Sequence, residues 1–142
     1  MRKNYVFYKI HSMQNSSTSI LVIDEHPMMR ESLCAAINAE SDLKTVETNS
    51  FDEDAIQIIV SARHDVLFLE QKPDIILFAL GSSGWGDLLA LKNLHNNLLG
   101  TPILVLTSDE ISGKEVKRFG AYAALNKTVS RNKLLETLRS IH

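Results

Sequence analysis

The stretch that decides the fold is "KPDIILFALGSSGWG", residues 72 to 86. Every position from Ile75 to Leu80 is apolar, which is typical of a central strand in a parallel sheet that is covered on both faces. Pro73 ends the preceding segment, and the glycine-rich run after Leu80 indicates a loop. The sequence therefore predicts a fully buried strand over Ile75 to Leu80 with a loop at its carboxyl end.

Further apolar runs alternate with helical patterns on both sides of this strand. Four more strands are predicted, over Ser19–Asp24, Leu43–Thr48, Ile103–Leu106 and Tyr122–Leu125. Helices are predicted from Pro27 to about residue 40, from the capping box at Ser50 toward Pro73, over Leu88–Leu98, over Lys114–Phe119, and from the cap at Ser130 to Ile141. This alternation with short connections predicts an α/β fold, a doubly wound parallel sheet between two layers of helices.

Length and composition fit one compact domain. The chain has 142 residues, of which 44% are hydrophobic and 23% are charged, and its formal net charge is -2. This charge gives no electrostatic reason to expect binding to nucleic acid or to an anionic membrane. No apolar run approaches the ~20 residues of a membrane span, and the single cysteine, Cys34, is expected to pack in the interior. We therefore expect a cytoplasmic protein without nucleic-acid or membrane contacts in this domain.

The first residues differ from the rest. Residues 1–19 begin with basic side chains, and Lys9 and His11 interrupt the apolar stretch before it is long enough for a secretion signal. A run of hydroxyl side chains from Ser16 to Ser19 is typical of a flexible joint. The sequence predicts an N-terminal extension over residues 1–19 and one domain over residues 20–142.

The candidate functional residues follow the predicted strands. In parallel sheets, function gathers outside the carboxyl ends of the strands, where this chain has Asp24, Glu25, Ala79, Thr107 and Lys127. Carboxylate oxygens bind hard cations such as magnesium, while a lysine and a hydroxyl can contact a phosphoryl group. A nucleophile is missing from this set, because the third strand ends in an alanine.

Four sequence segments occur in the order "LVIDEHPMMRESLCAAI", "KPDIILFAL", "TPILVLTSD" and "GAYAALNK". With them the chain, from about Ile20 to Ile141, resembles the receiver domains of bacterial response regulators, and specifically those of LuxR/NarL-type transcription regulators. The resemblance implies a flavodoxin/CheY-like fold with five parallel strands in the order 2-1-3-4-5. It also implies a non-enzymatic role in two-component, phosphorelay signal transduction and transcription regulation.

The resemblance assigns a role to each candidate. It implies that Asp24 and Glu25 bind magnesium, that Ala79 occupies the phosphoacceptor position, and that Thr107 and Lys127 are switch positions. A methyl group has no oxygen with which to form an acyl phosphate, so phosphorylation at Ala79 is excluded on chemical grounds. We expect no cofactor beyond weak, residual magnesium binding at Asp24 and Glu25. We further expect an ion pair between Lys127 and these acids, and a capping role for Thr107.

Other positions also depart from the family pattern. Ala124 stands where receivers carry an aromatic switch residue, and Tyr122, two residues earlier, lies at the wrong end of the strand to replace it. These departures favour a degenerate pseudo-receiver that acts by protein–protein interaction, independently of phosphorylation. Its predicted interface runs from Lys114 to His142 and contacts a protein partner or a second copy of the chain.

Two alternatives stay open. One is an ordinary phospho-receiver with an engineered Asp-to-Ala change at Ala79. The other is a flavodoxin-like binder of a small ligand, which Asp24 and Glu25 disfavour because they would repel a flavin phosphate after the first strand.

Overall fold

The computed structural model describes residues 17–46, 73–81, 88–98, 100–108 and 113–141. Three predicted segments lie wholly or mostly outside these residues: the extension over residues 1–19, the helix after Ser50, and the glycine-rich loop after Leu80. All structural statements below concern the described residues.

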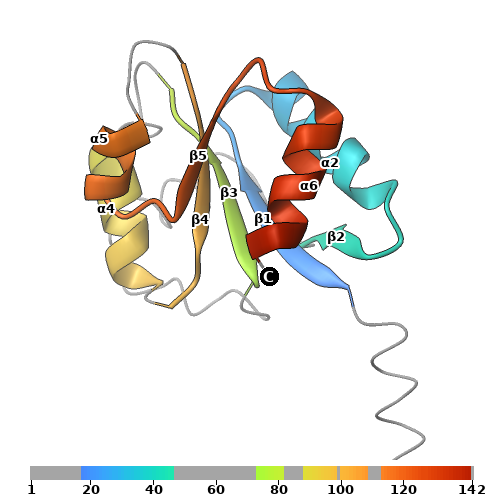
Figure 1. The fold of residues 1–142 in the computed structure, drawn as a ribbon, viewed down its shortest axis with the longest axis horizontal. Coiled ribbons are helices and arrows are strands. Elements are labelled where there is room, and N and C mark those ends of the chain that lie inside the picture. The colour runs from blue at the N-terminus through green and yellow to red at the C-terminus, as the bar shows by residue number, and fades with distance from the viewer. Residues whose placement is uncertain (1–16, 47–72, 82–87, 99, 109–112, 142) are drawn as a thin grey trace, which may run out of the picture.

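Five strands form one parallel sheet in the order β2-β1-β3-β4-β5, which confirms the predicted fold class and topology (Figure 1). Neighbouring strands are in register at Ile20 with Ile75, at Ile76 with Ile103 and at Leu104 with Ala123. The strands are β1 (Thr18–Ile23), β2 (Leu43–Thr45), β3 (Ile75–Ala79), β4 (Ile103–Thr107) and β5 (Ala123–Asn126).

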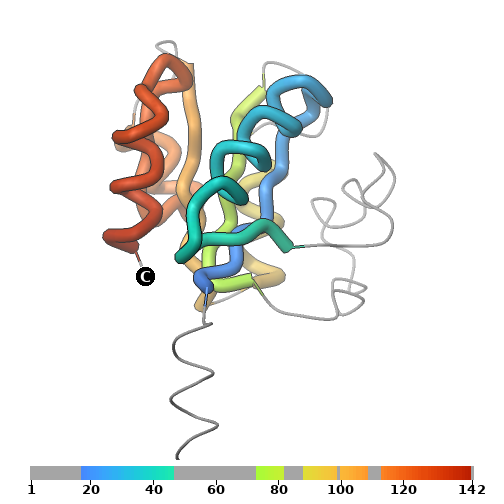
Figure 2. The backbone as a smooth tube through the Cα atoms, turned by 90° about the vertical axis from the view of Figure 1, so that its right-hand side faces the viewer, coloured from blue at the N-terminus to red at the C-terminus, as the bar shows by residue number. Residues whose placement is uncertain are grey.

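The described helices lie in two layers. They are α2 (Pro27–Asn38), α4 (Leu88–Asn97), α5 (Gly113–Arg118) and α6 (Arg131–Ile141). Helices α2 and α6 cover one face of the sheet, and α4 and α5 cover the other (Figure 1). Figure 2 looks onto the α2–α6 face and shows both helices in front of the strands. None of the described helices is both long and apolar enough to cross a bilayer.

The helix ends follow local sequence signals. Pro27 occupies the first turn of α2, where its missing N–H costs nothing. The hydroxyl oxygen of Ser130 accepts a hydrogen bond from the backbone N–H of Lys133 at 3.1 Å, which caps α6 as predicted. Gly120, which follows α5, has a φ of 113°, a conformation that favours glycine.

Strand alternation divides the core into two clusters. Leu21, Ile76 and Phe78 point toward α4 and α5, whereas their neighbours Ile20 and Leu77 point toward α2 and α6. Because helices cover both faces, every residue of β3 is buried, which is why its sequence is apolar at every position.

The predicted boundaries need small corrections. β1 begins at Thr18, whose backbone N–H donates to the backbone carbonyl oxygen of Asp42 at 3.0 Å, so Thr18 and Ser19 belong to the sheet rather than to a flexible joint. β2 ends at Thr45, before the predicted end at Thr48. The pairing of β1 with its neighbours sets the ends of β1 and β2. Sequence periodicity carries no information about this pairing.

Candidate functional site

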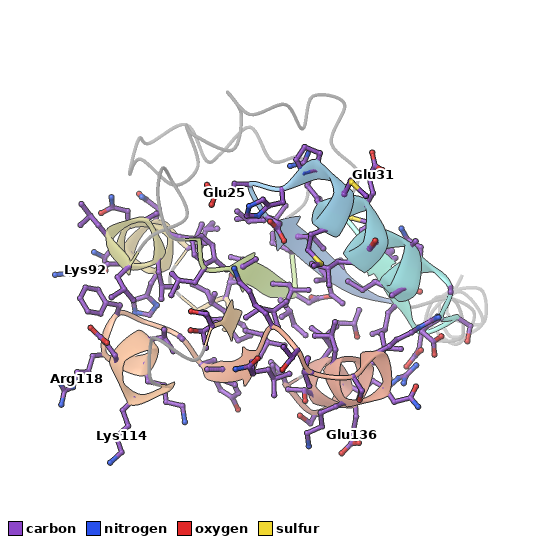
Figure 3. The ribbon with its side chains drawn as sticks, turned by 90° about the horizontal axis from the view of Figure 1, so that it is seen from above. Glu25, Glu31, Lys92, Lys114, Arg118 and Glu136 are labelled. Carbon is purple, nitrogen blue, oxygen red and sulfur yellow. The ribbon has the colours of Figure 1, made fainter. Side chains whose placement is uncertain are left out.

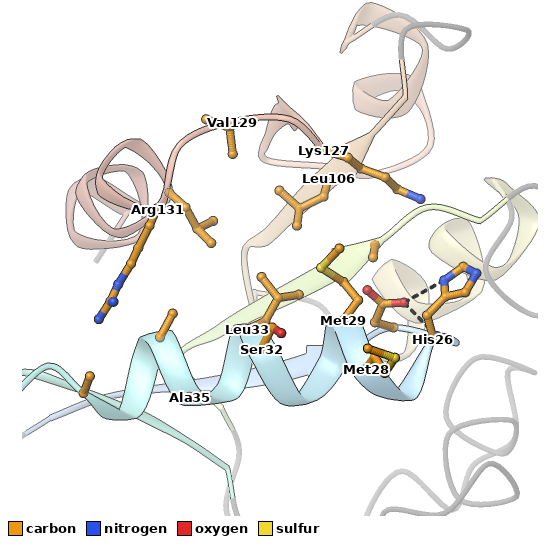
Figure 4. Close-up of a pocket in the computed structure, with 15 residues that line it drawn as sticks. His26, Met28, Met29, Ser32, Leu33, Ala35, Leu106, Lys127, Val129 and Arg131 are labelled. Atoms are coloured by element: carbon orange, nitrogen blue, oxygen red, sulfur yellow. Dashed lines mark hydrogen bonds and ion pairs between the residues drawn. The ribbon is translucent and has the colours of Figure 1, made fainter.

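The carboxyl ends of the strands bring the predicted residues together. Asp24 follows β1, Ala79 ends β3, and Lys127 follows β5; all three line one groove on the α2–α6 face (Figure 4). The backbone N–H of Lys127 donates to the backbone carbonyl oxygen of Thr107 at 2.9 Å, which ties the end of β5 to the end of β4. The parallel order of the strands produces this convergence.

Asp24 is held by its own neighbour in the chain. Its side chain is 97% buried, and Oδ1 accepts a hydrogen bond from the His26 backbone N–H at 2.8 Å and lies 3.2 Å from His26 Nδ1. Among the described residues Lys127 has no carboxylate within ion-pair distance, so the expected pair between Lys127 and the acids is wrong. The backbone N–H of His26 satisfies the buried carboxylate locally, and Lys127 stays exposed to water.

Glu25 turns to a different neighbour. Its carboxylate occupies the space that a β-carbon on Gly81 would need, so it packs against the backbone just after β3. In Figure 3, which looks down onto the molecule from above, Glu25 lies between α2 and α4. The two acids that the sequence predicts to act together therefore have separate partners, and of the two only Asp24 lines the groove.

A magnesium site needs several oxygen ligands that converge on one point. Within the described part of the chain, no group of three His, Cys, Asp or Glu side chains is arranged in this way. Ala79 contributes a methyl group where the family places a carboxylate. The described residues alone thus do not assemble a magnesium site, and weak residual binding at Asp24 and Glu25 stays a prediction.

Ala79 belongs to the core. It is 3% exposed and is part of the cluster that packs under α2 and α6. Thr107, at the end of β4, is also buried, and its hydroxyl donates to the Ser108 carbonyl at 3.1 Å. In this bond the hydroxyl is the donor, whereas a capping side chain accepts from a backbone N–H, so the capping role expected for Thr107 stays a prediction.

The switch position on β5 is small and half-buried. Ala124 packs against the core cluster under α4 and α5. Its methyl group cannot change rotamer as an aromatic side chain can. Tyr122 precedes β5 and is 62% exposed, so its ring lies in solvent rather than inside the domain.

The groove itself was not predicted. It encloses about 890 Å³ between α2 and α6, with Ala79 and Asp24 at one end and Ala39 at the other. Apolar side chains form most of its walls, among them Met29, Leu33 and Leu134 (Figure 4). A sequence signal exists in hindsight: Met28, at 83% exposure, and Met29 extend the apolar residues of α2 beyond the buried stripe of Leu33 and Ile37.

An ion network ties α6 to the segment after α2. The Arg139 guanidinium donates to Asp42 through Nε at 2.7 Å and through Nη2 at 2.9 Å, and to Glu40 through Nη2 at 2.7 Å. The hydrogen bond from Arg139 lowers the pKa of the Asp42 carboxyl below its ordinary value. Arg131 lies farther from Glu40, at 3.8 Å.

The fold and the arrangement of strand ends define a receiver-type regulatory domain. The family model described as "Response regulator receiver domain" matches residues 20–139, and the chain belongs to this family. Members are regulatory domains rather than catalytic enzymes, as the sequence predicts.

Two curated relatives of the chain are regulatory proteins by name. The chain is 28% identical over 123 residues to the transcriptional regulatory protein LiaR of Bacillus subtilis, and 27% identical over 126 residues to the oxygen regulatory protein NreC of Staphylococcus aureus. These matches cover 85% and 87% of this chain but 54% of each relative. The chain therefore spans about half the length of the curated relatives it matches.

Solved structures show the same fold. The receiver domain of the Francisella response regulator 1452 matches with a TM-score of 0.67 at 17% identity, covering 88% of this chain and 96% of that one. The chemotaxis protein CheY4 of Vibrio cholerae matches with a TM-score of 0.67 at 20% identity, covering 89% and 100%. A LuxR-family response regulator from Aurantimonas matches with a TM-score of 0.66 at 22% identity, covering 89% and 85%.

Proposed function

We propose that this receiver domain is a pseudo-receiver, which signals by protein contact and independently of phosphorylation. The observation that carries the proposal is the methyl group of Ala79 at the end of β3, packed in the core at 3% exposure. An alkyl carbon cannot attack phosphorus, so no phosphodonor can phosphorylate this position.

The surrounding acids support the same proposal. Phosphoryl transfer needs a cation that neutralises developing charge next to the acceptor. Asp24 instead accepts hydrogen bonds from His26, and Glu25 packs on Gly81. Lys127 is exposed and has no ion pair among the described residues, and position 79 offers it no carboxylate to contact.

We propose that the interface lies on the face from Lys114 to His142, formed by α5, β5 and α6. Its described part, residues 113–141, carries seven Lys and Arg against two Glu, although the whole chain has a net charge of -2. Lys114, Arg118 and Glu136 point outward from α5 and α6 (Figure 3). This basic excess favours an acidic protein partner over a second copy, because two copies would bring like charges together.

We propose that the pathway it serves is transcription regulation. The support is the likeness to LiaR, whose name describes a transcriptional regulatory protein. The role we propose uses protein contacts and needs no DNA contact by this domain.

The first experiment tests phosphorylation directly. The chain is incubated with acetyl phosphate and magnesium, and intact mass spectrometry is expected to find no phosphoryl adduct. An Ala79→Asp variant is expected to acquire a hydroxylamine-labile adduct, and Ala79→Asn, which has the same shape without the nucleophile, is not. A hydroxylamine-labile adduct on the unaltered chain, mapped to residues of the groove, refutes the proposal.

The second experiment tests the interface. Proteins retained from a lysate of the source cells at low salt are compared for the chain, for a Lys117→Glu/Arg118→Glu variant on α5, and for Lys92→Glu on α4. The retained partner should be lost with the first variant and at high salt, and kept with the second. Equal retention by all three proteins contradicts the proposed face, and a change in sedimentation of the chain alone identifies a second copy as the partner.

A further inference from the structure

We infer that the groove between α2 and α6 binds a small organic anion, with an acidic head group next to Lys127 at the Ala79 end and an apolar body along the helices. This inference goes beyond the receiver role and is independent of the partner proposed above, because binding can be measured on the isolated chain.

The size and walls of the groove fit a small molecule. Ligand sites are concave, span roughly 300–1,000 Å³ and are mostly apolar with a few polar groups. The groove encloses about 890 Å³, and Met29, Leu33, Leu106 and Leu134 offer it apolar surface (Figure 4). Methionine side chains adapt to ligands of different shape, which suits an entrance formed by Met28 and Met29.

The end of β3 lengthens this apolar surface. Ala79 lines the groove beside Leu106, its partner in the β3–β4 register. A carboxylate at this position would place a hydrated negative charge at the floor of the groove. The methyl group instead continues the apolar wall up to the strand ends.

The charges on the groove select an anion. Lys127 has no ion pair among the described residues, and the one acid near Arg131 is Glu40, 3.8 Å away and already bound by Arg139 at 2.7 Å. The acid of the groove, Asp24, already accepts a hydrogen bond from the His26 backbone N–H and lies 3.2 Å from His26 Nδ1. Lys127 is therefore open to a ligand at the Ala79 end while the carboxylate there is engaged, whereas Arg131 lies beside Glu40 at the other end (Figure 4). A charged hydrogen bond is stronger than a neutral one.

The experiment uses three probes with the same alkyl tail: octanoate, octan-1-ol and octylamine, each below its aggregation limit. Isothermal titration calorimetry and amide NMR shifts are recorded on the full chain. Octanoate should bind saturably, about tenfold more tightly than the alcohol, because a charged hydrogen bond is worth about one factor of ten. Shifts should concentrate on residues of α2, the end of β5 and the start of α6.

Matched variants locate the site. Lys127→Gln should weaken octanoate about tenfold and leave the alcohol unchanged, whereas Arg131→Gln, at the other end of the groove, and Lys133→Gln, on α6 outside it, should have little effect. Ala35→Phe, on an exposed position that lines the groove, should abolish binding of both probes. Glu31→Phe adds the same ring to α2 outside the groove and should not.

Several results would overturn the inference. These are the absence of saturable octanoate binding, equal affinity for the three probes, tighter binding of the amine, or equal effects of Ala35→Phe and Glu31→Phe. Sedimentation of each variant is measured as well. A shift in oligomeric state with Ala35→Phe, together with no response to octanoate, would assign the groove to a second copy instead.

Discussion

At the scale of single residues, one methyl group determines what the groove can do. The Ala79 side chain belongs to the core and to the wall of the groove, and a methyl group can neither ligate a cation nor act as a nucleophile. Nearby polar groups then depend on local partners, as Asp24 does on His26. A single position thereby changes the chemistry of the whole strand end.

Cys34 allows a test of the packing of α2. The thiol is half-buried against the core, and burial raises its pKa, an effect that Arg30 offsets only in part. The thiolate fraction at pH 8 is therefore low, and alkylation by iodoacetamide should be several-fold slower in the folded chain than in the chain unfolded in urea. Equal rates in both states would show that this face of α2 is not packed. Because Cys34 is the only cysteine, the total thiol signal reports it alone.

Gly120 is expected to resist substitution. Its φ of 113° is unfavourable for other residues, and a β-carbon there would meet the His95 side chain at 2.5–2.9 Å. Gly120→Ala should lower the free energy of unfolding by about 1–3 kcal/mol, measured by urea denaturation. The control is Gly113→Ala, whose nearest neighbour is the Ala124 methyl at 3.8 Å, and which should stay within about 0.5 kcal/mol. Similar effects of both changes would contradict the strain argument.

Sequence reasoning located most site residues but not their contacts. Asp24, Ala79 and Lys127 were predictable because parallel strands deliver their carboxyl ends to one edge. The partners of the two acids were not, since the direction of a side chain after a strand depends on the turn that follows. Glu25 reaches Gly81, which is distant in the sequence, and no pattern of residue types reports such a contact.

At the scale of elements, the capping of α6 gives a prediction. Ser130→Ala removes the acceptor of the Lys133 N–H and should cost about 1 kcal/mol, whereas Ser130→Asp should preserve most of the stability. Ser140→Ala, in the last turn of the same helix, is the control and should be nearly neutral. Urea denaturation measures all three. A neutral Ser130→Ala would mean that α6 does not depend on this cap.

The elements themselves follow from the sequence with small errors. β3, β4 and α4 differ from their predicted ranges by one residue at an end, because their apolar patterns are bounded by Pro73, Pro102 and Gly100. β2 has only three residues and lies at the edge of the sheet, where pairing with one neighbour decides its length. Periodicity in so short a segment carries little information.

At the scale of the whole molecule, Arg139 joins parts of the chain that are 97 residues apart through Asp42. Because the folded-state pKa of Asp42 is lowered, its contribution to stability is present above the ordinary carboxyl pKa of about 3.9 and is lost as the pH falls through the lowered value. Arg139→Gln should therefore reduce the loss of stability between about pH 5 and pH 2.

The measurement is urea denaturation at a series of pH values. Lys133→Gln, which removes a charge from the same helix at a 3.9 Å contact with Glu136, is the control and should leave the pH profile of the chain unchanged. Parallel profiles for the chain and for Arg139→Gln would show that Asp42 contributes nothing to acid sensitivity.

The buried end of β3 has a consequence for how the domain opens. Functional sites are often the places where a protein tolerates local frustration, and crowded acids are one form of it. Because Ala79 is uncharged and lies in the core, its side chain adds no repulsion between acids at this strand end. The Leu80 amide, which donates to the Leu106 oxygen at 2.9 Å, should then exchange its hydrogen only through global unfolding. A strand end that opens locally in a phosphorylated receiver would then belong to the slowest-exchanging part of this domain. Local opening of Leu80 in a hydrogen-exchange experiment would contradict this expectation.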